Sequence, residues 1–206
     1  MKKLLLAISL LLISLSAFAR VDVGLYGGYG VAAPDGKAEA TYTLIPPTFK
    51  AETSPAYDFG IYAEPYILDF LSVNAGVRYL SASPSVALDD EKTTFKYSFV
   101  MIPVSVRAYF ELLSIPWVVG LGYDVALSQS KEIKRENYDA TPYNPFDGEQ
   151  KDYKGGMFFE LGAKFKSGGF HYGLMMKING WDVYEKGATK LTTAAAVFQL
   201  FAGLSF

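Results

Sequence analysis

The sequence contains no cysteine and only one histidine, His171. Without a thiol, the chain has no disulfide framework, no cysteine nucleophile and no attachment point for a lipid on an N-terminal cysteine. Beyond the N-terminus, no stretch is apolar over the roughly 20 residues that a helix needs to cross a bilayer. The formal net charge is −2 and no basic block is present, so no nucleic-acid partner is expected.

Apolar and aromatic residues are abundant in these 206 residues. Hydrophobic residues make up 50% and aromatic residues 16%, with 15 Tyr, 15 Phe and 19 Gly. Such totals are typical of a single-domain membrane barrel, but a soluble β-sandwich shares them. The alternation of residues along the strands therefore has to distinguish the two.

The N-terminus has the three parts of a secretory signal. Lys2 and Lys3 form a positive region, residues 4–15 form a short apolar region, and Ala17 and Ala19 are the small residues that a signal peptidase reads. Residues 1–19 are predicted to be a cleaved signal peptide, with an uncleaved anchor helix as the alternative. The mature domain would be 20–206, and loss of the two lysines would change its net charge to −4.

Eight segments alternate between apolar and polar residues with a period of two, as strands of a small membrane barrel do. They are 21–31, 57–64, 71–79, 100–110, 117–125, 157–165, 170–179 and 192–206. Short connections at 65–70, 111–116 and 167–169 alternate with long polar ones at 32–55, 81–94, 128–152 and 180–191. The pattern predicts an all-β fold: an eight-stranded antiparallel up-and-down β-barrel whose termini lie at the end with the short turns.

The composition of the two faces indicates which one points outward. One face carries large aliphatic and aromatic residues without a charge, which would be an unusually large exposed patch in water. The other face is rich in glycine, which leaves room for long side chains in a narrow barrel. Its glycines are Gly24, Gly28, Gly30, Gly60, Gly76, Gly120, Gly122, Gly162, Gly173 and Gly203. We expect the apolar face to meet lipid; a lipocalin-like soluble barrel, with the apolar face inside, is the alternative.

The last segment, TTAAAVFQLFAGLSF from Thr192 to Phe206, ends in an aromatic residue after alternating apolar ones. It resembles the C-terminal recognition strand of bacterial outer-membrane β-barrels. The segment IPVSVRAYF, Ile102 to Phe110, resembles a stretch of the family that includes the OmpX- and OmpA-like barrels.

The resemblance implies a transmembrane barrel in the outer membrane of a Gram-negative cell, in contact with outer-membrane lipids. It also implies that the barrel-assembly machinery reads the C-terminal strand. The residues of that assembly signal would be Phe198, Leu200, Ala202, Leu204 and Phe206. No peptidoglycan-binding segment follows the barrel pattern, so the cell-wall anchoring of OmpA-type proteins is not expected.

Seven charged residues are predicted to point into the barrel. They are Glu64, Arg78, Arg107, Asp124, Glu160, Lys164 and Lys177. Buried charges need partners, so we expect a structural ion-pair network; a selectivity filter or proton path is the alternative. Eight strands enclose only enough room for side chains, which excludes a wide pore.

Aromatic residues near the strand ends are predicted to form two girdles at the membrane surfaces. The first, at the periplasmic rim, would contain Phe110, Trp117, Phe165, Phe170 and Phe206; the second, at the outer rim, would contain Tyr57, Tyr97, Tyr153 and Trp181. Pro103 lies in the middle of a strand, where it cannot donate to the ladder, and is predicted to mark a bulge.

No catalytic residue, cofactor or metal site is expected. His171 has no serine two residues further along its strand, as outer-membrane lipid A deacylases would have, and is interpreted as a polar residue near the periplasmic end. The run GLYGGYG, Gly24 to Gly30, looks like a phosphate loop but lies in a strand with no helix after it.

Three functions are considered from the sequence. The first is a non-enzymatic envelope scaffold whose long loops bind an extracellular partner or ligand, since loops on rigid scaffolds often carry function. The second is a narrow, OmpW-like conduit for small or hydrophobic molecules. The third, a lipid-modifying enzyme that uses His171, is the least favoured.

Overall fold

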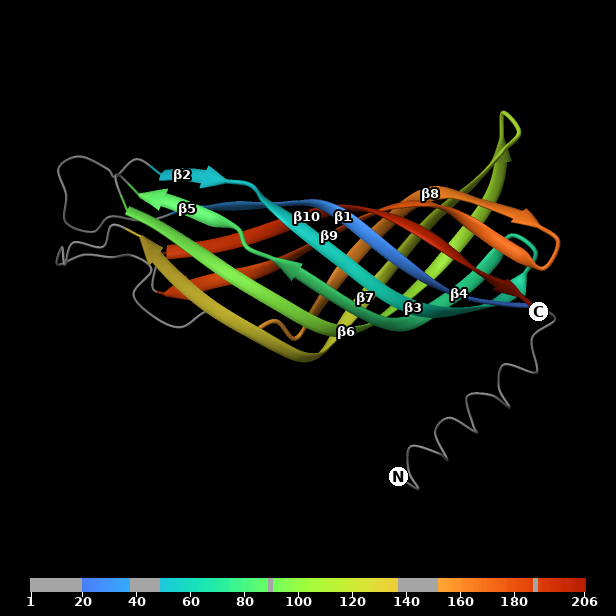
Figure 1. The fold of residues 1–206 in the computed structure, drawn as a ribbon, viewed down its shortest axis with the longest axis horizontal. Helices are drawn as coiled ribbons and strands as arrows, with labels where there is room; N and C mark the ends of the chain where they lie inside the picture. The colour runs from blue at the N-terminus through green and yellow to red at the C-terminus, as the bar shows by residue number, and fades with distance from the viewer. Residues whose placement is uncertain (1–19, 38–48, 89–90, 137–151, 187–188) are drawn as a thin grey trace, which may run out of the picture.

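The computed structural model describes residues 20–37, 49–88, 91–136, 152–186 and 189–206, and these residues form a single closed sheet (Figure 1). The predicted signal peptide, 1–19, lies outside the described residues, as do parts of the long connections. The strands are β1 (Val21–Lys37), β2 (Phe49–Glu52), β3 (Ser54–Leu68), β4 (Leu71–Ala82), β5 (Ser85–Leu88), β6 (Glu91–Leu112), β7 (Ile115–Glu136), β8 (Gly155–Ser167), β9 (Phe170–Lys186) and β10 (Thr189–Ser205).

Eight of these strands close the barrel, each paired antiparallel with its neighbours in the order β6-β4-β3-β1-β10-β9-β8-β7, and β7 pairs again with β6. β1 and β10, the first and last strands, pair antiparallel from Asp22 opposite Ser205 to Lys37 opposite Lys190. Two further backbone hydrogen bonds extend this ladder at the chain ends, from Val21 N to Phe206 O at 3.0 Å and from Phe206 N to Val21 O at 2.9 Å. The predicted eight-stranded antiparallel barrel is confirmed.

No helix among the described residues is long and apolar enough to cross a membrane.

The two ends of the barrel differ. The terminal end holds Arg20, Phe206 and three tight turns, at 69–70, 113–114 and 168–169, within the short connections predicted. Leu113 and Ser114 both have positive φ, at 55° and 61°, which suits the twist of a two-residue hairpin. The β6–β7 hairpin projects beyond the other turns (Figure 1). The opposite end, which holds β2 and β5, is called the loop end below.

The loop end contains more sheet than the alternation predicts. β2 and β5 fall inside the expected loops 32–55 and 81–94, pair with each other, and join β6 through β5. β6 and β7 are each 22 residues long and run well past their predicted limits. The prediction of loops there was wrong because these extensions lack a strict apolar alternation, and cross-strand pairing holds them instead.

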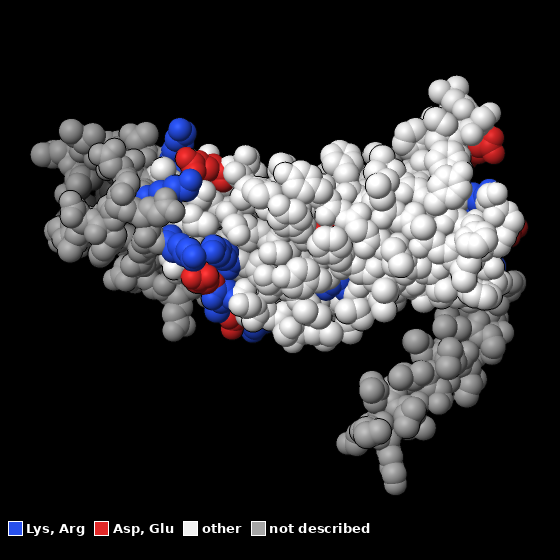
Figure 2. Space-filling view, in the orientation of Figure 1, with Lys and Arg blue, Asp and Glu red and all other residues white. Residues whose placement is uncertain are grey.

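The exterior of the barrel is apolar, as predicted. Leu25, Ile61 and Leu200 are 62–69% exposed, whereas Asp58 and Arg78 are fully buried inside. Figure 2 shows a broad band with few charged side chains between clusters of charged residues at the two ends. The soluble-barrel alternative, with the apolar face inside, is therefore wrong.

The predicted bulge at Pro103 is not present at that residue. Pro103 keeps its pairing with Asp124 on β7, and the register of β6 and β7 shifts between Val100 and Met101 instead. On its other side, Pro103 has no partner in the ladder of β4 and β6, which skips from Ala75 to Arg78. The missing N–H is thus accommodated by an interrupted ladder.

Gly203 on β10 marks a place where two backbones come close together. A Cβ at this position would lie 2.0 Å from Val23 O and 2.7 Å from the Gly24 Cα atom. At Gly27, on the outer face of β1, a Cβ would meet only the ring of Phe59, at an ordinary 3.5 Å. The absence of a side chain at Gly203 therefore allows the close approach of β10 and β1 that closes the barrel.

We expect Gly203→Ala to destabilise the barrel by about 1–3 kcal/mol, because overpacking forces the backbones apart. Gly27→Ala is the matched control and should be close to neutral. Unfolding in urea, followed on gels by the loss of the fast-migrating folded band, measures both. Equal midpoints for the two variants would contradict this account of the closure.

Candidate functional site

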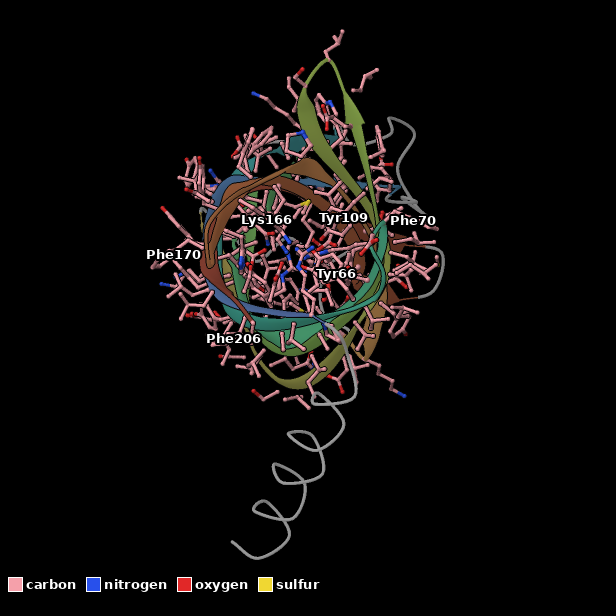
Figure 3. The ribbon with its side chains drawn as sticks, turned by 90° about the vertical axis from the view of Figure 1, so that its right-hand side faces the viewer. Tyr66, Phe70, Tyr109, Lys166, Phe170 and Phe206 are labelled. Carbon is pink, nitrogen blue, oxygen red and sulfur yellow. The ribbon has the colours of Figure 1, made fainter. Side chains whose placement is uncertain are left out.

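The interior of the barrel near the terminal end is a network of paired charges (Figure 3). Glu64 is fully buried and accepts hydrogen bonds from Ser72 Oγ at 2.7 Å, Lys164 Nζ at 2.9 Å and Arg107 Nη1 at 3.1 Å. The Tyr109 hydroxyl also donates to Glu64. One carboxylate thus joins side chains from β4, β6 and β8.

Arg107 links this group to the middle of the barrel. Its guanidinium forms a bidentate pair with Glu160, with Nε at 2.8 Å from Oε2 and Nη2 at 2.9 Å from Oε1. Lys177 lies 3.9 Å from Glu160 and 3.5 Å from Asp124, and its ammonium sits 3.3 Å from the centre of the Phe158 ring. Bidentate pairing fixes the orientation of the guanidinium as well as its charge.

Arg78 is the innermost cation and is fully buried. It contacts Asp58 at 2.7 Å, Asp124 at 2.6 Å and the Asn179 side-chain oxygen at 3.3 Å. Gln199 donates a further hydrogen bond to Asp58 at 2.8 Å. Every charge in this group therefore has a partner, as burial in a dry interior requires.

All seven charged residues predicted to point inward lie in this network. Two of its members, Asp22 and Asp58, were missed, although they share the inward face of β1 and β3. Asp22 pairs with Lys164 at 2.8 Å and with Arg20 at 3.0 Å. Both stand at even positions of strands whose even-numbered residues face inward, so the alternation alone would have identified them.

The network fills the lumen. The space inside it is about 20 Å³, lined by Tyr26, Tyr62, Arg107, Glu160 and Lys177 among others. A volume of that size holds about one water molecule. Paired side chains therefore close the lumen at this level.

The half of the interior near the loop end is apolar and aromatic, which corrects the predicted outer girdle. Tyr97, Tyr153 and Trp181 are buried inside the barrel, and only Tyr57 points outward. Tyr97 stacks on Phe99 with 5.4 Å between ring centroids. The prediction was wrong because it placed these aromatics by their position near strand ends. It did not use the alternation of inward-facing and outward-facing residues along the strands.

The barrel wall is incomplete near the loop end. β7 and β8 pair only as far as Val125 and Gly155, followed by one hydrogen bond from Ala126 N, and β8 and β9 pair only as far as Phe158 and Asn179. β6–β7 and β9–β10 continue to pair beyond these points. Among the described residues, a gap therefore separates β7 beyond Ala126 from β9 beyond Asn179; it is called the wall gap below.

Asp152 and Tyr153 lie in the wall gap, where hydrogen bonds tie them to β7 and the Tyr153 ring lies 6.5 Å from that of Trp181 on β9. Tyr153 N donates to Gln129 Oε1 at 2.9 Å, and Gln129 Nε2 donates to Asp152 Oδ1 at 2.8 Å. The Tyr153 ring packs 5.1 Å from that of Phe99. A hydrogen bond from Lys131 holds the pKa of the Asp152 carboxyl below its usual value, so the contact persists until the pH falls through that lowered pKa.

A cavity of about 690 Å³ opens beside the wall gap. Tyr153, Gly155, Gly180 and Trp181 line one side of it, together with polar residues of β1, β9 and β10. It is much larger than the space of about 20 Å³ within the charge network.

Solved structures share this arrangement of strands. OprG of Pseudomonas aeruginosa aligns with a TM-score of 0.50 at 13% identity, over 90% of this chain and 95% of that one. Neisserial surface protein A aligns at 0.45 and 12%, over 86% and 96%, and Ail of Yersinia pestis at 0.37 and 12%, over 90% and 99%. No protein-family model and no curated protein matches the chain.

The fold is that of a small outer-membrane β-barrel.

On this outer-membrane barrel fold, the residues of the predicted assembly signal form an outward row on β10. Phe198, Leu200, Ala202, Leu204 and Phe206 are all exposed. Among the predicted aromatics of the terminal end, Phe110 and Phe165 also point outward, and Trp117 is half-buried. Figure 3 shows Phe170 and Phe206 outside the barrel, with Tyr66 and Tyr109 directed into it.

His171 is buried inside the barrel fold, near the terminal end. Its Nε2 lies 2.6 Å from the Tyr62 hydroxyl, its Nδ1 lies 3.2 Å from Ser205 Oγ, and Asp22 is 4.0 Å away. Ser205 was missed because the search ran along one strand, whereas His171 pairs with Gly203 on the adjacent β10. Both ring nitrogens have partners, so the group ties β3, β9 and β10 together.

The glycine run does not form a phosphate loop in this barrel fold. The run from Gly24 to Gly30 lies within β1 and pairs with β3 and β10 along its length. Among the residues that the structure describes, no three His, Cys, Asp or Glu side chains group so as to hold a metal ion.

Loss of Arg78 tests the network. Arg78→Met leaves Asp58 and Asp124 buried without their cation, and we expect a loss of about 3–5 kcal/mol in unfolding free energy. The triple variant that also carries Asp58→Asn and Asp124→Asn should recover part of this loss, because it no longer buries the two unpaired charges.

Lys96→Met is the control for this measurement. Lys96 lies 3.9 Å from Glu132 in an exposed pair, and exposed pairs contribute about 0–1 kcal/mol. Urea unfolding in detergent measures all three proteins. An Arg78→Met midpoint equal to that of Lys96→Met would contradict the role given to Arg78.

Proposed function

We propose that the chain is an integral outer-membrane protein without enzymatic activity, a closed barrel that stabilises the envelope and binds a ligand or partner at its loop end. One observation carries the proposal: a broad apolar exterior band with few charges surrounds an interior that buries a network of paired charges. That distribution suits a bilayer, whose core cannot solvate charge, and is the inverse of a soluble barrel.

The orientation follows the usual layout of such barrels, with short turns in the periplasm and long connections outside. Residues 1–19 would direct export and be removed. The outward row on β10 that ends at Phe206 would be read by the barrel-assembly machinery. The band of exposed aliphatic and aromatic residues would contact outer-membrane lipids.

A closed scaffold is favoured over a pore through the lumen. Arg78 with Asp58 and Asp124 spans the interior, all three fully buried, and the space around the network holds about one water molecule. An ion crossing the lumen would have to break several buried pairs. The loop end, with its charged strand extensions and the 690 Å³ cavity, offers the surface for binding.

Purified protein in planar bilayers should show no steady ion current, because the charge network blocks the lumen. The same preparation should migrate faster on gels before heating than after it, and should fractionate with outer membranes. A steady current would favour a conduit through the lumen. Recovery of the mature protein in the aqueous periplasmic extract would remove the membrane assignment.

A second candidate, uptake of small hydrophobic molecules through the wall, is favoured by the wall gap. Hydrogen bonds with the Gln129 side chain hold Asp152 and Tyr153 in the gap in place of a backbone ladder, and apolar and aromatic residues fill the interior beside it. Releasing Asp152 and Tyr153 from Gln129 would connect that interior with the lipid without disturbing the charge network.

A disulfide across the wall gap tests this route. The chain has no cysteine, so Gln129→Cys with Asp152→Cys gives a single possible bond. We expect the oxidised pair to slow the uptake of N-phenyl-1-naphthylamine by intact cells that express the protein, and reduction to restore it. Gln129→Cys alone is the control. Equal uptake before and after reduction would dismiss the route through the wall.

A further inference from the structure

Buried polar atoms without a partner gather at the wall gap. Among the described residues, five buried side-chain atoms have no hydrogen-bond partner, and one of them, Asn74 Nδ2, lies elsewhere. The other four are Tyr153 Oη, Asn179 Nδ2, Trp181 Nε1 and Thr193 Oγ1. Trp181 pairs across the sheet with Thr193, Asn179 is two residues before Trp181 on the same inward face, and the Tyr153 ring lies 6.5 Å from that of Trp181.

The burial of these four side chains makes the absence of partners significant. Each is at most 7% exposed, so water does not take the place of the missing hydrogen bonds at the surface. An unpaired buried donor keeps its full desolvation cost, and native folds leave few such atoms. Four of them in one neighbourhood point to a bound molecule that supplies the missing bonds.

We propose that Tyr153, Asn179, Trp181 and Thr193 form a binding site for a small, mostly apolar, neutral molecule that carries a hydrogen-bond acceptor, such as an ester or ketone. The proposal deepens the ligand-binding role proposed above and rests on it for the placement of the site at the outer face of the membrane.

The donors determine the polar part of the ligand. Asn179 Nδ2 and Trp181 Nε1 can only donate, and the hydroxyls of Tyr153 and Thr193 can donate as well. A ligand that satisfies them must therefore accept. It must also be neutral, because Arg78, 3.3 Å from the Asn179 oxygen, is already paired with Asp58 and Asp124.

The surroundings determine the rest of the ligand. Phe99 packs on both Tyr153 and Trp181, with ring centroids at 5.1 Å and 5.6 Å. Tyr97 lies 6.3 Å from Trp181 in an edge-to-face arrangement, and its own hydroxyl is satisfied by Val183 O at 2.7 Å. An aliphatic or aromatic body suits these walls, with a single acceptor turned toward the four donors.

Glycines provide the route to the site. Gly155 and Gly180 line the 690 Å³ cavity, and the ladder of β8 and β9 does not extend past Phe158 and Asn179. A Cβ on Gly156 would lie 3.0 Å from Tyr153 Oη and 3.2 Å from Gly180 O. The Tyr153 hydroxyl is thus directly behind a part of the wall that has no side chains.

The experiment uses Trp181 as its own reporter. The chain has two tryptophans, so Trp117→Phe leaves Trp181 alone, and its emission is followed while methyl octanoate is added to the protein in nanodiscs. We expect saturable binding of methyl octanoate and at least tenfold weaker binding of n-nonane, which lacks an acceptor, and of octanoate, which is charged. Equal affinity for the ester and for nonane would overturn the proposal.

Two conservative variants separate binding from structure. Thr193→Val and Tyr153→Phe should each weaken methyl octanoate binding about tenfold while leaving the urea midpoint of the ligand-free barrel unchanged or higher, because each removes an unsatisfied group. Ser72→Ala is the matched control: it removes a buried hydroxyl that is satisfied by Glu64 at 2.7 Å, away from the site, and should lower the midpoint without changing affinity. A lower midpoint for Thr193→Val and Tyr153→Phe would assign both hydroxyls a structural role and overturn the site.

The glycine route is tested by Gly180→Val. A Cβ there meets only Thr193 O, at 3.4 Å, so the barrel should tolerate the change while the association rate of methyl octanoate falls at least threefold. Ala196→Val, outside the cavity lining, should leave the rate unchanged. Equal rates for both variants would overturn access through these glycines.

Failure of the site and failure of the proposed function give different results. A protein that shifts on heating, fractionates with outer membranes and binds no methyl octanoate refutes the site and leaves the outer-membrane scaffold intact. A protein absent from outer membranes refutes the scaffold, whatever it binds.

Discussion

Closure of the sheet by hydrogen bonds between its first and last strands is the constraint on which the rest of the structure depends. In a bilayer, no water can satisfy an exposed strand edge, so every backbone group must find its partner within the sheet. The bonds between Val21 and Phe206 meet that requirement at the terminal end, and Gly203 allows the two backbones to come close enough there. Once the sheet is closed, its inward residues must fill a narrow cylinder.

The two halves of that cylinder are filled in opposite ways. Near the terminal end, carboxylates and cations from several strands pair around Glu64, Glu160 and Arg78. Near the loop end, aromatic rings around Phe99 and Trp181 take their place. The charged half is costly to disturb because each ion depends on its partners. The aromatic half depends on packing alone, so it is the part of the interior that can make room for another molecule.

The wall gap lies beside the aromatic half, where the closure constraint is relaxed. There the Gln129–Asp152 hydrogen bond takes the place of backbone pairing on the β7 side, and unpaired polar atoms gather behind glycines. In a rigid scaffold, segments with incomplete backbone pairing are the ones that can open or bind a ligand most readily. The barrel therefore has a stable half, filled by the charge network, and a less constrained half beside the wall gap.

The period-two alternation by itself determined which residues face inward, because successive side chains on a strand point to opposite sides. It placed Arg78, Asp124 and Glu160 inside and Leu200 and Phe206 outside, and it indicated the number of barrel strands. Only the tertiary structure decided which charges meet, that Ser205 lies beside His171, that Tyr153 packs against Phe99 and Trp181, and that β2 and β5 extend the wall. Those features depend on cross-strand register and on where each ladder stops, and both are set by closure of the whole sheet rather than by any one segment.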